Sequence, residues 1–202
     1  HVTGVQTCAL PIFIRSREPR ILNLDPPEHL TGTTQQRQLD YLEALNHDHL
    51  QHHPGEADLE ARMSSYTLAA RMQTAAKEAM DISSESEATR KLYGIDQELT
   101  RDYGTRCLIA RRLVERGVRF VQIINNGQSW DHHSTLPKRH PELCAQSDQP
   151  VAALVKDLKS HGLLDSTLVH WGGEMGRLPV IQNESLGRDK VGRDHNTYGF
   201  TM

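Results

Sequence analysis

Residues 118–124 read VRFVQII, and this stretch decides the expected fold because it is β-branched and largely apolar. A run of this composition predicts a strand that is buried on both faces, as in a covered parallel sheet. A helix is predicted just before it, at residues 100–117, since apolar side chains recur there at helical spacing and Gly117 suits a left-handed helix end. The chain is therefore expected to pass from a helix into a buried strand.

The same unit recurs further along the chain. An apolar face at residues 151–158 predicts another helix, which ends at Gly162, and residues 167–171 (TLVHW) predict a second strand followed by a glycine-rich loop. A strand, a helix and a strand at this spacing predict parallel strands joined by a right-handed crossover. We therefore expect an α/β fold in residues 100–202.

The N-terminal half has a different character. Residues 14–99 are predicted to be mostly helical, because apolar side chains recur at helical spacing on both sides of the breaker Pro54-Gly55. Residues 2–12 (VTGVQTCALPI) look like a translated sequencing adapter, so residues 1–13 are set aside as an expected artefact. We expect the chain to be an internal fragment, open at both ends.

Charge and hydropathy narrow the possible functions. The 202 residues carry 23 Lys and Arg against 26 Asp and Glu, a formal charge of -3, with no long block of one sign, so no nucleic-acid partner is expected. The longest apolar runs fall far short of the roughly 20 residues that a membrane-spanning helix needs, so no membrane span is expected. Cys107 and Cys144 remain once the adapter-like stretch is removed, and they neither establish nor exclude a disulfide.

Possible metal ligands follow both predicted strands. Ligands gather beyond the carboxyl ends of strands in open parallel sheets, and an extended backbone would place Asp131 and His133 on the same side. The second loop adds Glu174, Asp194 and His195. Carboxylates and imidazoles together favour zinc, manganese or iron over calcium.

Simpler interpretations of these side chains stay open. Glu174 could cap a helix or pair with Arg177, and Asp194 could pair with Arg193 or Arg188. Four histidines between residues 47 and 53 are expected to lie on a solvated surface, and they are His47, His49, His52 and His53.

An ordered set of motifs spans the last hundred residues or so. The motifs are CLIARRLVERG at 107–117, RFVQ at 119–122, WDHHS at 130–134, GLLD at 162–165, WGGEMGR at 171–177 and GRDHN at 192–196. As a set they resemble the bacterial family called domain of unknown function 1501. That family is placed near the sulfatases in the alkaline-phosphatase superfamily, so the resemblance implies a parallel-sheet, three-layer sandwich with this chain in its C-terminal half.

The resemblance also implies a site and a reaction. Superfamily members cleave phosphate or sulfate esters at a two-metal centre, which implies one or two divalent ions here, zinc or manganese, and an anionic small-molecule or polysaccharide ester as substrate. The implied metal ligands are Asp131, His133, Glu174, Asp194 and His195, with Asp194 either a ligand or an outer partner. Arg177 is expected to face the anionic substrate, and His132 is expected to be a bystander.

The nucleophile of the superfamily lies near the end of the first strand, and no such segment is found in this chain. Cys107 resembles the start of the sulfatase motif Cys-x-Pro-x-Arg, but Ile109 stands where Pro is needed, and the helical stripe predicts a buried core cysteine. We therefore expect metal-assisted hydrolysis in a periplasmic or secreted full-length parent and no activity in this chain alone. The alternative is a non-catalytic secreted binding or scaffold protein with a degenerate metal site, favoured by Met175 where relatives carry His.

Overall fold

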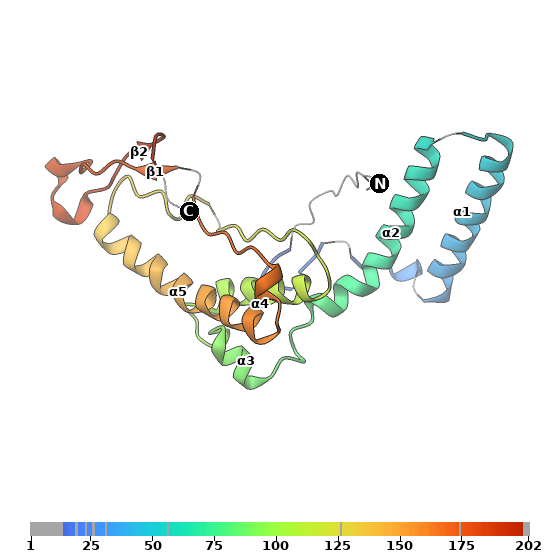
Figure 1. Ribbon diagram of the computed structural model, residues 1–202, viewed down its shortest axis with the longest axis horizontal. Coiled ribbons are helices and arrows are strands. Elements are labelled where there is room, and N and C mark those ends of the chain that lie inside the picture. Colours follow the sequence, from blue (N-terminus) through green and yellow to red (C-terminus); the bar gives the residue numbers. More distant parts are fainter. Residues whose placement is uncertain are drawn as a thin grey trace. The chain divides into compact units, whose positions relative to one another are not determined.

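The computed structural model of the chain describes residues 14–18, 20–22, 24–25, 27–30, 32–55, 57–125, 127–173 and 175–199 (Figure 1). Helices dominate these residues, and the chain divides into two compact units, His1–Asp81 and Ile82–Met202. The adapter-like stretch lies outside the described residues.

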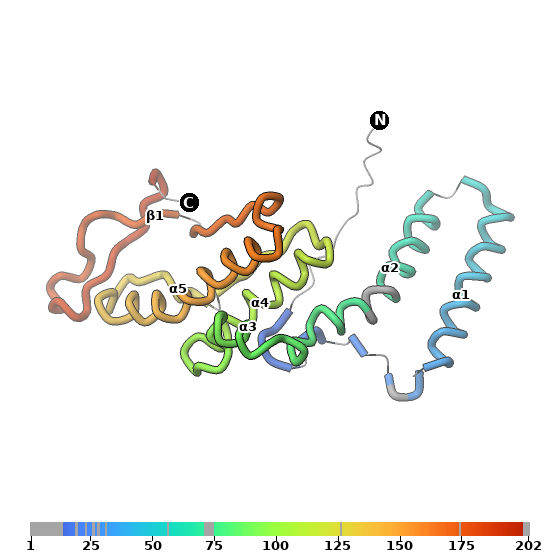
Figure 2. The backbone as a smooth tube through the Cα atoms, turned by 60° about the horizontal axis from the view of Figure 1, so that its bottom comes forward, coloured from blue at the N-terminus to red at the C-terminus, as the bar shows by residue number. Residues whose placement is uncertain are grey.

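The first unit contains two long helices, α1 (Thr33–His52) and α2 (Ala57–Met80), after the short 3-10 helix η1 (Glu28–Leu30). The two predicted helices of this half are confirmed, and they run side by side in Figures 1 and 2. The break between them falls at Pro54-Gly55, where Gly55 has a φ of 95°, a value that glycine adopts without a steric penalty.

No residue of α1 is buried, and its large hydrophobic side chains Tyr41, Leu42 and Leu45 are exposed. The four histidines near its end are exposed, as predicted. Among the described residues, no helix of either unit combines the length and the apolar character needed to cross a membrane.

The second unit has its core where α4 (Arg101–Glu115) packs against α5 (Leu136–Ser160), with the short α3 (Glu87–Leu92) beside α5. The most deeply buried side chains of this unit are Tyr93, Cys107, Leu108, Pro150 and Leu158. Gly104 permits close packing, since a Cβ at this position would stand 2.2 Å from the carbonyl oxygen of Tyr93. The prediction of a buried core cysteine is confirmed, because Cys107 is 1% exposed.

A buried ion-pair network links α4 to α5 and to the segment before α3. Arg111 on α4 pairs with Glu85 at 2.7 Å, with Glu115 at 2.7 Å and with Asp157 of α5 at 2.9 Å. The hydroxyl of Tyr93 donates to Asp157 at 2.9 Å. Because a buried charge is costly unless it is paired, these contacts allow Arg111 and Asp157 to remain in the interior.

The predicted α/β fold with a parallel-sheet, three-layer sandwich is wrong for this structure. Residues 118–124 and 167–171 have no regular secondary structure, and the 3-10 helix η2 (Leu164–Ser166) precedes the second stretch. Within the described residues the sheet is a single antiparallel pair of two-residue strands.

The physical reason is that a strand needs neighbouring strands to satisfy its backbone, whereas β-branched composition only describes a side-chain surface that fits a sheet. At residues 118–124, groups outside a sheet form some of the backbone hydrogen bonds that neighbouring strands would otherwise form. The Val118 N–H donates to the last turn of α4 at the Leu113 carbonyl, 3.0 Å away, and Arg106 Nη1 donates to the Ile124 carbonyl at 2.7 Å. Phe120 is consequently 83% exposed instead of buried.

Candidate metal centre

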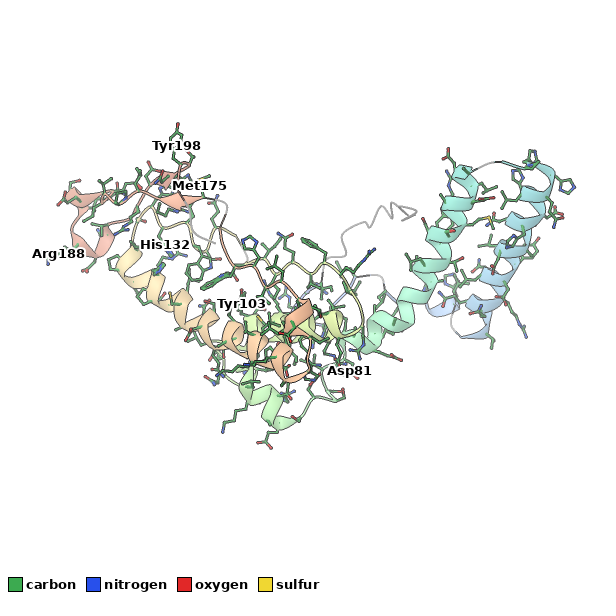
Figure 3. All side chains as sticks on the ribbon, viewed as in Figure 1. Asp81, Tyr103, His132, Met175, Arg188 and Tyr198 are labelled. Atoms are coloured by element: carbon green, nitrogen blue, oxygen red, sulfur yellow. The ribbon has the colours of Figure 1, made fainter. Side chains whose placement is uncertain are left out.

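A hairpin and the loop before α5 build the candidate site. β1 (Gly176–Arg177) pairs antiparallel with β2 (His195–Asn196), which places Arg177 opposite His195. The connection contains the 3-10 helices η3 (Glu184–Leu186) and η4 (Arg188–Lys190). Figure 3 shows Met175, next to β1, at the same end of the second unit as His132 of the loop.

Hydrogen bonds from the hairpin to two backbone carbonyls join it to the loop. The Arg193 N–H donates to the His132 carbonyl at 2.9 Å, and Asn183 Nδ2 donates to the His133 carbonyl at 2.8 Å. Gly192 is required at this contact, since a Cβ there would stand 2.0 Å from the carbonyl carbon of His133. The positions of the loop histidines are therefore set by the hairpin.

Three of the predicted metal ligands come together in this arrangement. One side-chain ligand atom from each of Asp131, His133 and His195 lies within 4.8 Å of the others, and all three residues are half-buried. Asp131 Oδ1 is 3.0 Å from His133 Nε2 and 3.1 Å from His195 Nε2, and the imidazole centroids are 4.8 Å apart. One carboxylate and two imidazoles form a donor set that fits zinc or manganese.

Gln182, which the sequence pattern did not reveal, orients the ring of His133. His133 Nδ1 lies 2.9 Å from the side-chain oxygen of Gln182. In the tautomer that donates from Nδ1 to this oxygen, Nε2 is the atom that could bind a metal ion beside Asp131. An outer partner of this kind fixes both the tautomer and the direction of a metal-binding histidine. No motif marks Gln182, because its position depends on the path of the hairpin.

Arg177 also contacts the triad, through a short ion pair between its Nη1 and Asp131 Oδ1. The side chains are 24% and 17% exposed respectively. The hydrogen bond from Arg177 is the main reason that the pKa of Asp131 lies below its usual range; burial opposes the shift and the hydrogen bond with His195 supports it. Asp131 is thus ionised at neutral pH, the form required for metal binding.

The remaining predicted ligands are placed differently. Asp194 lies beside the triad, with Oδ1 3.8 Å from His133 Nδ1, and it accepts a hydrogen bond from the backbone N–H of His195 at 2.8 Å. Asp194 therefore lies near the imidazole of His133 and holds the backbone of His195, not its ring. Glu174 lies outside the described residues.

Aromatic rings lie next to the triad around His132, which is 4% exposed. Its ring packs edge-on against His140, with centroids 5.8 Å apart, and Trp130 packs edge-on against both His140 and Trp171, at 5.5 and 6.4 Å. Burial is the largest cause that lowers the pKa of His132. His132 is not part of the triad, and its ring belongs to this packing.

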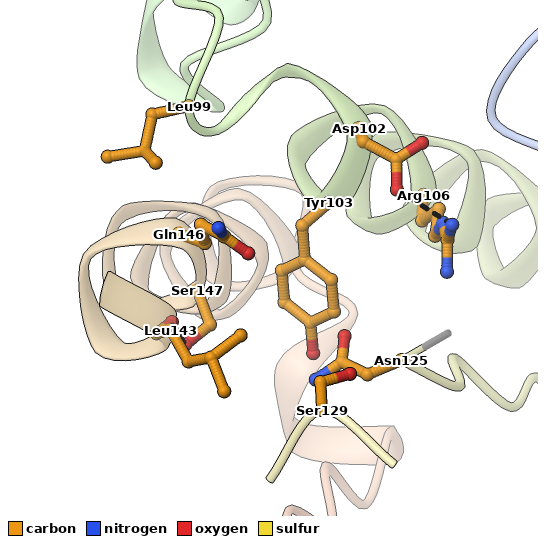
Figure 4. A pocket seen from close by; sticks show the side chains of 9 residues that line it. All are labelled: Leu99, Asp102, Tyr103, Arg106, Asn125, Ser129, Leu143, Gln146 and Ser147. Carbon is orange, nitrogen blue, oxygen red and sulfur yellow. Dashed lines mark hydrogen bonds and ion pairs between the residues drawn. The ribbon is translucent and has the colours of Figure 1, made fainter. Parts of the chain in front are cut away.

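A separate cavity of about 240 Å³ is lined by residues of α4 and α5 and by Leu99, Asn125 and Ser129. Figure 4 shows the Tyr103 hydroxyl directed toward Asn125 and Ser129. Burial raises the pKa of Tyr103 to about 12, so its hydroxyl is protonated at neutral pH. The cavity shares no lining residue with the triad.

Comparison with known proteins identifies the family. A family model described as "Protein of unknown function (DUF1501)" matches residues 8–202. The chain belongs to this family. The resemblance found in the motifs is thereby confirmed at the level of the DUF1501 family. No curated protein and no solved structure matches the chain.

Proposed function

We propose that this DUF1501 member binds a divalent transition metal, zinc or manganese, through Asp131, His133 and His195, and that the site serves the hydrolysis of phosphate or sulfate esters. The observation that carries the proposal is the convergence of one carboxylate and two imidazoles within 4.8 Å. These residues come from a loop and from a strand more than sixty positions apart.

The chain's own residues provide the supporting parts of such a site. Gln182 can accept a hydrogen bond from His133 Nδ1, which would leave Nε2 for the metal ion, and Asp194 accepts a hydrogen bond from the backbone N–H of His195. Arg177 provides a planar set of donors that matches the oxygens of a phosphate or sulfate group. When bound, a divalent cation supplies a Lewis acid for the ester oxygens.

The kinship with sulfatases and the alkaline-phosphatase superfamily is part of the same proposal. It is supported by the ordered motifs at 130–134, 171–177 and 192–196, which contribute the triad and Arg177. The substrate class that follows is an anionic ester, either a small molecule or a polysaccharide.

The proposal is tested by metal content, measured by mass spectrometry after equilibration with zinc or manganese and removal of free metal. The wild-type chain is expected to retain about one equivalent, and Asp131→Ala and His195→Ala are expected to weaken binding at least roughly 100-fold, since even an outer-shell partner is worth about 10- to 100-fold. His170→Ala, which removes an exposed histidine outside the triad, serves as the control and is expected to retain the metal.

A folded wild-type chain that retains neither metal would refute the proposed site. If metal is bound, hydrolysis of nitrophenyl phosphate and nitrophenyl sulfate by the full-length protein tests the reaction. Metal binding without hydrolysis of any ester would instead support the non-catalytic binding protein.

A further inference from the structure

One oxygen of the candidate metal centre has three partners. Asp131 Oδ1 accepts the Nη1 hydrogen bond of Arg177, and the same atom lies 3.0 Å from His133 Nε2 and 3.1 Å from His195 Nε2. The triad's carboxylate is therefore bound by a cationic side chain at the atom that faces both imidazoles.

A divalent cation and Arg177 have conflicting requirements at this atom. A cation held by both Nε2 atoms would meet Asp131 at Oδ1, where the guanidinium already donates. Two positive charges at one carboxylate oxygen repel each other, and the repulsion is weakly screened because Asp131 and Arg177 are 17% and 24% exposed. Cation binding thus favours departure of the guanidinium.

The backbone of Arg177 limits where its side chain can go. Arg177 lies in β1, where its Cα is in register with that of His195, so the guanidinium can change partners only within reach of the triad. Its planar fork of donors forms paired hydrogen bonds with an oxyanion as well as with a carboxylate. An oxyanion that arrives beside the cation would therefore receive the guanidinium that Asp131 releases.

We propose that Arg177 couples cation and oxyanion binding by exchanging Asp131 Oδ1 for a phosphate or sulfate oxygen, so that each ligand strengthens the binding of the other. This inference rests on the proposed metal site and adds a regulatory property to it. Linkage requires the coupling to be reciprocal: the factor by which the anion tightens cation binding equals the factor by which the cation tightens anion binding.

The test is isothermal titration calorimetry of manganese into the full 202-residue chain, in chloride and in sulfate at matched ionic strength. In the wild type, sulfate is expected to tighten manganese binding about fivefold, within the usual range of coupling between two sites. Arg177→Met removes the competitor, so in chloride it is expected to bind manganese about tenfold more tightly than the wild type, on the scale of a lost charged hydrogen bond. Sulfate should have no effect on this variant.

Arg188→Met removes an exposed arginine of η4 and controls for the change in net charge. It is expected to behave as the wild type does, and circular dichroism establishes that each variant is folded. If the wild type binds manganese but Arg177→Met binds it equally or more weakly, or keeps the sulfate effect, the coupling is refuted and the metal site stands. If neither the wild type nor Arg177→Met binds manganese, the proposed function itself is refuted.

Discussion

Cys107 and Cys144 differ in their exposure to solvent. Cys107 is 1% exposed in the helical core, and burial raises its pKa to about 12, whereas Cys144 is exposed on α5. Iodoacetamide at pH 8 is expected to modify Cys144 in the native protein and to leave Cys107 unmodified, because the thiolate is the reacting form. Peptide mapping by mass spectrometry measures each site separately.

The same shift fixes the sign of a pH effect on stability. The pKa of Cys107 in the folded protein is raised above its ordinary value near 8.5. The protein is therefore expected to keep its full stability, as far as Cys107 is concerned, below about pH 8.5 and to lose stability as the pH rises toward 12.

The control for the alkylation experiment is the chain unfolded in guanidinium chloride, in which Cys107 and Cys144 should both react. Rapid modification of Cys107 in the native state would contradict the buried core cysteine.

At the residue scale, the sequence nominates candidate ligands but does not predict their contacts. Asp131, His133 and His195 were found because carboxylates and imidazoles follow apolar runs, and the structure brings these three together. The sequence offers Glu174 or a substrate as the partner of Arg177, whereas in the structure its guanidinium contacts Asp131. That pairing depends on the path of the hairpin, which spacing along the chain does not encode.

At the scale of elements, an ion pair of Asp157 joins α5 to α4. It pairs with Arg111 at 2.9 Å and accepts from Tyr93 at 2.9 Å, with its side chain 8% exposed. Asp157→Asn is expected to lower the free energy of unfolding by about 3 kcal/mol, because removing one partner leaves the other charge buried with fewer partners. Urea unfolding followed by tryptophan fluorescence measures the loss.

Asp165→Asn is the matched control, since it makes the same chemical change at an exposed residue of η2. It is expected to change stability by less than about 0.5 kcal/mol. If the two variants were equally stable, the buried contacts of Asp157 would contribute no more to stability than the exposed side chain of Asp165 does.

Helices were predictable from the sequence at this scale and strands were not. The expected helices at 100–117 and 151–162 correspond to α4 and to the last part of α5, because a helix forms its hydrogen bonds within its own segment. The start of α5 at Leu136 was not foreseen, since Pro141 and Pro150 lie inside it and proline ordinarily breaks a helix. The strand predictions were wrong because the pairing of a strand depends on segments elsewhere in the chain.

At the scale of the whole molecule, the two compact units differ in how they are stabilised. The second unit contains the fully buried Tyr93, Leu108 and Leu158, whereas α1 in the first unit has no buried residue. Most of the stability of a helix in a protein comes from packing of its apolar face, and α1 has no buried face. We therefore expect His1–Asp81 to unfold at lower denaturant concentration than Ile82–Met202.

The distribution of tryptophan makes this difference measurable in the intact chain. The only two tryptophans of the sequence, Trp130 and Trp171, belong to the second unit, whereas the long helices of the first unit contribute to the circular dichroism at 222 nm. In a urea titration the dichroism should begin to fall before the fluorescence changes, because different probes coincide only when unfolding is a single cooperative step. Coincident curves would show one cooperative unit, and the buried core near α4 and α5 would then have to stabilise the helices of the first unit as well.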